Sequence, residues 1–198
     1  MSDVRIVIAY HSGFGHTLRL AEHIRDGALT VPGAAVELVS VAELDDRLWD
    51  TLGAADAIIF GSPTYMGSAS AVFHAFAEEA SKVWAVRGWQ DKLAAGFTAS
   101  GGMSGDKLNT LQYLAVFAAQ HGMNWINLGL EPGWNMTYAT ENDRNRLGFY
   151  IGVGAQTFND VAAEGMNSGD LETGVALGAR VAEAARVVKA GRSALVAP

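Results

Sequence analysis

The chain has no cysteine among its 198 residues, which excludes disulfides, thiolate metal sites and cysteine nucleophiles. It has no apolar run of about 18 residues either, so the sequence predicts no membrane-spanning helix. No basic stretch followed by a long apolar run stands at the N-terminus, and we expect a cytoplasmic protein. Lysine and arginine number 14 against 21 acidic residues, a net charge of −7. Because so acidic a chain binds polyanions poorly, we expect no nucleic-acid partner and no membrane partner.

The composition that remains is that of a globular protein. Hydrophobic residues make up 49% of the sequence, and the length predicts one domain over residues 1–198 with a sizeable core. His11, His23 and His74 have no metal-like spacing, and the sequence has neither a G-x-S-x-G elbow nor an H-E-x-x-H motif. We therefore expect no metal site and no hydrolytic triad.

Short apolar runs alternate with segments of helical periodicity along most of the chain. This alternation predicts an α/β fold with a parallel, doubly wound sheet, in which ligands bind at the carboxyl ends of the strands. The expected strands are residues 4–10, 35–40, 57–60, 93–98 and 124–130, and the expected helices are residues 17–29, 43–54, 69–83, 106–120 and 171–190.

Residues 131–170 do not follow the alternation. They carry Trp134, Tyr138, Phe149 and Tyr150 together with several glycines. A long irregular segment in a compact domain is usually functional or interfacial. We expect this segment to cover the ligand site or to form an oligomer interface.

The loop after the first strand, residues 11–17, has the composition of a phosphate site without a cation. It offers the Ser12 and Thr17 hydroxyls, free backbone N–H groups and a helix N-terminus, which together can bind a phosphomonoester. Gly13 and Gly15 lack the third glycine of the dinucleotide fingerprint, and the loop lacks the lysine of a P-loop. The alternative is a plain strand-to-helix turn with a threonine cap.

Two further loops follow strands that end at the same edge of the predicted sheet. In the first, Pro63 ends the strand, and Tyr65 and Met66 could stack on a planar apolar ring, or could be ordinary packing residues. The second, residues 100–105, is rich in glycine and offers backbone donors to the edge of a ring, or is a flexible connector. Together the three loops predict a site for a phosphorylated, flat ligand.

Four motifs in this order resemble the WrbA-type NAD(P)H:quinone oxidoreductases. Residues 12–16 (SGFGH) resemble the phosphate loop of that family, residues 63–67 (PTYMG) its Pro-Thr-Arg-Phe-Gly loop, residues 92–105 its Lys-Leu-Ala strand and following loop, and residues 121–123 its His-Gly-Met. The similarity covers about residues 4–130. It implies a flavodoxin-like three-layer sandwich with a five-stranded parallel sheet in the order 2-1-3-4-5.

The resemblance also implies the cofactors and the reaction. FMN would be the resident cofactor, NADH or NADPH the electron donor and a small quinone-like molecule the acceptor, with two electrons passing in a ping-pong hydride cycle. The residues implied to bind FMN lie in the three loops and are Ser12, Gly13, Phe14, Gly15, His16, Thr17, Pro63, Thr64, Tyr65, Met66, Gly67, Ala99, Ser100, Gly101, Gly102, Met103 and Ser104.

The substrate side of the implied site consists of Phe14, Trp84 and His121, with His121 as the catalytic residue. From the sequence alone, His121 is also a histidine at a helix C-terminus, favoured there by the helix dipole. Tyr65 stands where the family has arginine, and an insertion that the family has after its second strand is missing. The related NADPH-dependent FMN reductases share the fold and are compatible with that gap.

The assembly and one alternative function complete the expectations. Shared active sites in the family imply a homodimer or a homotetramer. The alternative is a flavodoxin-type electron carrier without its own substrate turnover, with which an acidic chain is compatible.

Overall fold

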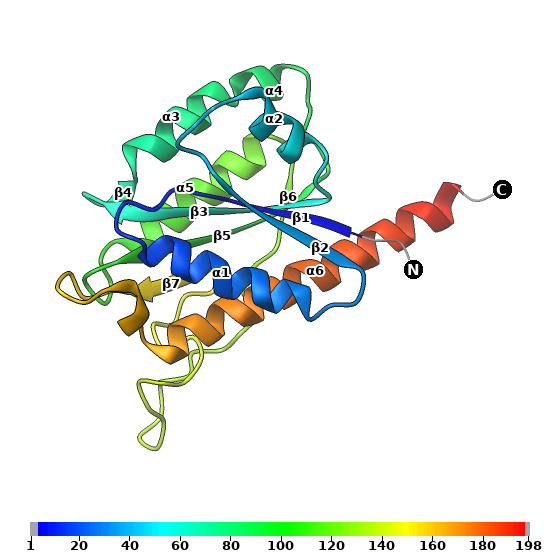
Figure 1. Cartoon of the computed structure of the whole chain (residues 1–198). Coiled ribbons are helices and arrows are strands. Elements are labelled where there is room, and N and C mark those ends of the chain that lie inside the picture. Colours follow the sequence, from blue (N-terminus) through cyan, green and yellow to red (C-terminus); the bar gives the residue numbers. More distant parts are fainter. Residues whose placement is uncertain (1–3, 197–198) are drawn as a thin grey trace.

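The computed structural model describes residues 4–196, which form one α/β unit (Figure 1). The strands are β1 (Val4–Tyr10), β2 (Ala34–Ser40), β3 (Ala57–Tyr65), β4 (Ser68–Ala69), β5 (Leu93–Ser100), β6 (Asn124–Trp125) and β7 (Val153–Gln156). The helices are α1 (His16–Leu29), α2 (Asp46–Gly53), α3 (Ala71–Glu79), α4 (Ser81–Ala85), α5 (Lys107–Gln120), α6 (Ser168–Val196) and the 3₁₀ turn η1 (Ala163–Gly165).

The main sheet is parallel and has the order β2-β1-β3-β5-β6. Counted by the strands predicted from the sequence, this order is 2-1-3-4-5, so the predicted α/β doubly wound fold is confirmed. The strand residues are apolar on both faces because helices cover both faces of a parallel sheet. Ile58, Ile59 and Phe60, for example, are all fully buried in β3.

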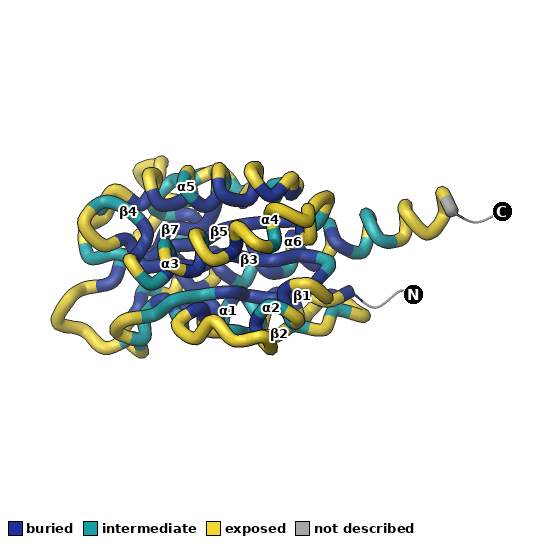
Figure 2. The backbone as a smooth tube through the Cα atoms, turned by 90° about the horizontal axis from the view of Figure 1, so that it is seen from above, coloured by how far each residue is buried: buried dark blue, intermediate teal, exposed yellow. Residues whose placement is uncertain are grey.

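The core is divided by the sheet into two layers of apolar contacts. Helices α1 and α6 pack on one face, where Ile8, Leu20 and Leu177 are buried together. Helices α2, α3 and α5 pack on the other face, where an aromatic cluster gathers around Phe60 and Phe76. Figure 1 shows these three layers, with the sheet between the two groups of helices, and Figure 2, seen from above, shows the buried residues of the central strands and the exposed residues of the helices. Within residues 4–196, no helix is long and apolar enough to cross a membrane.

The fifth strand differs from the prediction of a continuous strand over residues 124–130. Asn124 and Trp125 pair with the start of β5, and the chain then leaves the sheet until β7, which pairs with the end of β5. The indole N–H of Trp125 donates to the carbonyl of Ile151 at 2.8 Å, which joins the two ends of the segment that lies outside the sheet. The fifth position of the sheet is thus shared by two short strands, and much of the irregular segment lies between them.

The third strand is longer than predicted because it runs through Pro63 to Tyr65. Gly61 is the last residue of β3 that pairs with β1, and Pro63 lies two residues further on. The N–H that proline lacks would have faced no neighbouring strand, so Pro63 does not interrupt the pairing of β3 with β5. The predicted helix 69–83 is in turn two helices, α3 and α4, which meet at Ala80.

Candidate functional site

Four segments that follow strands of the sheet line one cleft of about 580 Å³. Three of them are the predicted loops after β1, β3 and β5, which meet at the carboxyl ends of the strands as the fold requires. The fourth follows β7 and belongs to the irregular residues 131–170, which the sequence predicts to cover the ligand site or to form an oligomer interface. The lining residues are Phe14, His16, Thr17, Pro63, Thr64, Tyr65, Ala99, Ser100, Gly101, Thr157, Asn159, Asp160, Val161 and Ala162. None of these lining residues is a lysine or an arginine.

The first loop presents the N-terminus of α1 to the cleft. Gly15 has a φ of 89°, a left-handed conformation that glycine adopts without strain, and it directs the chain into the helix. The Ser12 hydroxyl accepts the N–H of Leu18 at 3.2 Å. The N–H groups of His16 and Thr17 have no acceptor among residues 4–196. Two free amides at a helix N-terminus form a ready site for an anion.

The second loop is a tight hairpin between β3 and β4. Met66 and Gly67 both have a positive φ, at 49° and 85°, as a two-residue hairpin turn with matching twist requires. Tyr65 lines the cleft and packs edge-on against Phe14, with 6.4 Å between the ring centroids. Met66 points to solvent and does not line the cleft. Of the two predicted stacking residues, the structure brings only Tyr65 to the site.

The Thr64 side chain anchors the second loop to the protein. Its hydroxyl lies 2.7 Å from that of Thr98 in β5 and 2.8 Å from that of Thr110 in α5, and all three side chains are buried. Because these bonds occupy the hydroxyl, Thr64 offers the cleft mainly its backbone. The three threonines hold the ends of β3 and β5 at a fixed separation.

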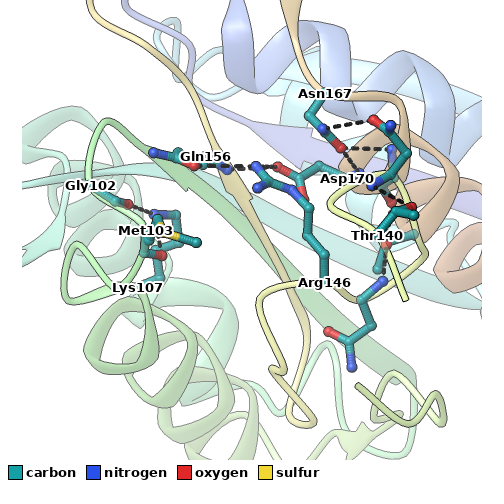
Figure 3. A network of polar contacts seen from close by, with 12 residues as sticks. Gly102, Met103, Lys107, Thr140, Arg146, Gln156, Asn167 and Asp170 are labelled. Atoms are coloured by element: carbon teal, nitrogen blue, oxygen red, sulfur yellow. Dashed lines mark hydrogen bonds and ion pairs between the residues drawn. The ribbon is translucent and has the colours of Figure 1, made fainter. Parts of the chain in front are cut away.

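The third loop is held from behind by a network of charged and polar side chains (Figure 3). The Lys107 ammonium donates to the carbonyls of Gly102 and Met103, and the Gln156 amide donates to that of Gly101 at 3.3 Å. Gln156 is itself bonded to Arg146 and Asp170, which form a buried ion pair. Ala99, Ser100 and Gly101 line the cleft, whereas Gly102, Met103 and Ser104 continue beyond its lining.

The segment 157–162 lies opposite the first loop and is fastened to it. The Nε2 atom of His16 is 2.9 Å from the carbonyl oxygen of Val161. A Cβ on Gly101 would meet the Asn159 side chain at 2.7 Å, so this segment also packs closely on the third loop. Its signal in the sequence is weak, because the preceding strand β7 has only four residues.

A second compartment of about 480 Å³ adjoins the cleft on the other side of this segment. His16, Thr157, Val161 and Ala162 line both compartments. Met103, Trp134 and Phe158 give the second compartment an apolar wall, and Arg146 and Glu141 give it charge. Part of the irregular segment therefore lies directly beside the cleft.

The structure does not bring His121 and Trp84 to this cleft. Helix α5 starts beside the third loop and runs back over 14 residues, about 20 Å at 1.5 Å per residue, before it reaches His121. His121 and Trp84 line a separate pocket of about 520 Å³ at the other end of the sheet. Within one chain these two residues lie away from the cleft, and their assignment to the substrate side of the site stays a prediction.

His121 is nevertheless an unusual core residue. Its ring packs between Trp89 and Phe117, with centroids at 4.6 and 4.8 Å, and its Nδ1 has no hydrogen-bond partner among the described residues. Burial lowers the pKa of His121. Trp84 beside it is 57% exposed. The pocket at the far end of the sheet thus combines an imidazole whose Nδ1 has no partner among the described residues with an exposed indole.

No group of three or more metal-ligating side chains is found within the described part of the chain. The features of the cleft itself are those of a site for an organic ligand. It combines free helix-terminal amides, one aromatic wall and glycine-rich backbone, and it falls within the usual volume range of small-molecule and cofactor sites, about 300–1,000 Å³.

Comparison with known proteins identifies the class. The family model described as NADPH-dependent FMN reductase matches residues 4–129, and the chain belongs to this family. Within it the chain is a WrbA-type, flavodoxin-like protein. A crystal structure of a WrbA-like flavodoxin from Agrobacterium tumefaciens is 42% identical, covers 93% of this chain and 99% of its own, and superposes with a TM-score of 0.75.

Two curated relatives show the breadth of the family. Flavodoxin FldP from Pseudomonas aeruginosa is 42% identical over 178 residues, 90% of this chain and 95% of the relative. An NAD(P)H dehydrogenase (quinone) from Archaeoglobus fulgidus is 30% identical over 203 residues, 91% of this chain and 97% of the relative. The family resemblance drawn from the sequence motifs is confirmed.

Proposed function

We propose that this protein binds FMN in the cleft and passes two electrons from NADH or NADPH to a small quinone-like acceptor. The observation that carries the proposal is the convergence of three strand-end loops on one cleft, with two free amides at the N-terminus of α1 and no basic side chain in the lining. A phosphomonoester can be bound by amides and a helix dipole alone. The names of the family and of its quinone dehydrogenase relatives support the reaction.

The residues present fit this cofactor. The segment from Ser12 to Thr17 would hold the phosphate, through backbone amides and the two hydroxyls. Pro63 to Gly67 and Ala99 to Ser104 would flank the ring, with Tyr65 as the aromatic wall. When bound, FMN supplies the capacity to accept a hydride and to return it to a second substrate.

The chain's own part in the reaction is to bind, orient and exclude water. Phe14 and Tyr65 offer an apolar surface on which a flat substrate can lie. The segment 157–162 forms the opposite side of the cleft. Since one cleft serves both the nicotinamide and the acceptor, the first product must leave before the second substrate enters, which is the ping-pong order.

The proposed roles of Trp84 and His121 require a second copy of the chain, whose cleft these two residues would reach. Trp84 and the neighbouring Val86 are exposed apolar side chains, 57% and 77% accessible, and Trp84 lines the same pocket as the largely buried His121. In a homodimer or homotetramer this pocket could face the cleft of a neighbouring subunit. Trp84 and His121 would then contact the substrate from across the interface, as the family resemblance implies.

A flavodoxin-type electron carrier is the second candidate, and the name of one relative favours it. FldP, 42% identical to this chain, is called a flavodoxin. A carrier needs the FMN site but no substrate pocket, so the two functions differ in what happens after the cofactor is bound.

Reconstitution with FMN followed by a turnover assay tests the proposal. The purified protein should take up FMN and then oxidise NADH or NADPH rapidly only when benzoquinone is present. A protein that remains colourless refutes the FMN site. A protein that holds FMN but oxidises neither nucleotide in the presence of benzoquinone is a carrier, and the enzymatic proposal is then wrong.

A further inference from the structure

Lys107 is a fully buried lysine at the start of α5, directly behind the third loop of the cleft (Figure 3). Its ammonium donates to the carbonyls of Gly102 and Met103, the second at 3.3 Å. Burial lowers its pKa to about 8, with Asp170 opposing the shift and Arg146 adding to it. A buried charge is costly unless it is well bonded, so its presence here calls for a function.

The carbonyl before these two is fixed in a similar way. Gly101 accepts from the amide of Gln156 at 3.3 Å. Gln156 is oriented by Arg146 at its Oε1 atom and by Asp170 at its backbone N–H. Three successive carbonyls of the loop are therefore drawn toward the protein interior by two side chains.

Because peptide bonds are planar, the orientation of these three carbonyls also fixes the direction of the three backbone N–H groups that follow them. All peptide bonds in residues 4–196 are trans, so each N–H points opposite to the carbonyl of the preceding residue. The N–H groups of Gly102, Met103 and Ser104 consequently point away from Lys107 and Gln156. No group within residues 4–196 accepts any of these three protons, and all three residues are exposed.

The charge behind this row of amides is a net positive one. Asp170 from α6 and Arg146 from the segment between β6 and β7 are the charged groups that act on Lys107. They form a bidentate pair with each other and largely cancel. Lys107 remains as the uncompensated cation of the cluster.

We propose that Lys107 is a positioning residue for the flavin, which turns the amides of residues 102–104 outward and whose charge favours the reduced cofactor over the oxidised one. The inference rests on the proposed FMN site. A hydride from NAD(P)H brings two electrons and one proton to the neutral ring, so the nucleotide becomes NAD(P)⁺ and the ring gains one negative charge. A nearby ammonium and outward-facing amides stabilise that charge.

Replacement of Lys107 by methionine tests this role. The reduction potential of FMN bound to wild type, Lys107→Met and Lys107→Arg is measured against a reference dye, together with the FMN dissociation constant. Lys107→Met should lower the ratio of reduced to oxidised FMN at a fixed potential at least tenfold, which for a two-electron couple is about 30 mV. Lys107→Arg should stay near wild type, because it retains the charge and the donors.

Lys82→Met is the matched control, since Lys82 is half-exposed on α4 and its loss changes the net charge equally. Its potential should equal that of wild type. A Lys107→Met protein that binds FMN at an unchanged potential overturns the inference and leaves the lysine a structural role. A wild-type protein that fails to bind FMN refutes the proposed function instead, so the two failures are distinct.

A measurement on the wild-type holoprotein covers the case in which Lys107→Met does not fold. The potential should fall more steeply with pH above about pH 8 than below it, because Lys107 loses its proton more readily while the flavin is oxidised. Asp170 and Arg146, the charged groups that act on Lys107, are paired with each other. A slope that is the same on both sides of this pH contradicts the inference.

Discussion

Arg146 and Asp170 face each other as a bidentate ion pair, with Nε–Oδ1 and Nη2–Oδ2 distances of 2.9 Å each. Both side chains are buried, at 7% and 2% exposure. One comes from the irregular segment and the other from the first turn of α6, and Asp170 also accepts the N–H of Gln156. The pair thus fastens the segment between β6 and β7 to the body of the protein and, through Gln156, to the third loop.

Removal of one partner of this pair should be costly. Arg146→Met leaves the Asp170 carboxylate buried without its counter-charge, and we expect a loss of about 3–5 kcal/mol in the free energy of unfolding. Denaturant unfolding measures the loss. Arg47→Met removes the guanidinium from the exposed contact with Glu37 at 3.9 Å and should cost below about 1 kcal/mol. Equal effects of the two substitutions would contradict the structural role assigned to the buried pair.

The first and second loops should be coupled through Gly13 and Tyr65. A Cβ on residue 13 would collide with the Tyr65 hydroxyl, so Gly13→Ala should displace Tyr65 and weaken FMN binding about tenfold, or about 1.4 kcal/mol. In Gly13→Ala/Tyr65→Phe the nearest remaining ring atom is at 3.4 Å, and most of the affinity should return.

Fluorescence titration with FMN measures this coupling. Gly53→Ala is the control, since a Cβ at that helical position meets nothing within 4 Å. If the double variant binds FMN as weakly as Gly13→Ala, the two loops are not coupled through this contact.

The burial of Lys107 should appear in the pH dependence of stability. Its pKa is lowered from 10.5 to about 8, so between these values the unfolded chain binds more protons than the folded one. Stability contributed by this group therefore rises as the pH increases through that window. The free energy of unfolding of the wild type, minus that of Lys107→Met, should therefore increase from about pH 8 upward. A difference that stays constant or shrinks would show that the lysine is not buried in its charged form.

Subunit complementation should reveal whether Trp84 acts across an interface. Trp84→Ala should retain FMN affinity, because this side chain lies at the opposite end of the sheet from the cleft of its own chain. Its quinone reductase activity should nevertheless fall. Mixed oligomers with the Ser12→Ala/Thr17→Val variant would contain sites with an intact phosphate loop and a partner's intact Trp84. Co-refolding of the two variants should restore part of the activity, whereas no recovery in demonstrably mixed oligomers would argue against a shared site.

The strands themselves and the position of the three loops could be predicted because they depend on local patterns, whereas the order of the strands was implied by the family resemblance. Apolar runs such as residues 4–10 and 57–60 are buried on both faces, and alternation with helices then places their carboxyl ends together. The four-residue strand β7 could not be found this way, since so short a run has no usable periodicity. The segment 157–162 that follows it lies within the irregular residues 131–170 expected to cover the ligand site, but its own bounds could not be given for the same reason.

Other features depend on tertiary contacts that sequence patterns do not encode. The sequence Asp106-Lys107 reads as the exposed start of a helix, yet the Lys107 side chain turns inward beneath the loop. No glycine or proline in the sequence marks the break between α3 and α4 at Ala80. The place of His121 could have been deduced from topology, because a helix that follows β5 returns to the opposite end of the sheet. The family motif implies a role for His121 but does not say where the residue lies relative to the cleft of its own chain.

The central claim is that the amides and hydroxyls of residues 12–17 bind the phosphate of FMN without a cationic side chain. The dissociation constants of FMN and of riboflavin, which lacks the phosphate, test it most directly. Wild type should bind FMN at least about a hundredfold more tightly than riboflavin, or about 2.7 kcal/mol. Ser12→Ala/Thr17→Val should lose affinity for FMN while its affinity for riboflavin stays the same. Equal affinity of the wild type for the two ligands, or an equal loss of both in the variant, would contradict the account.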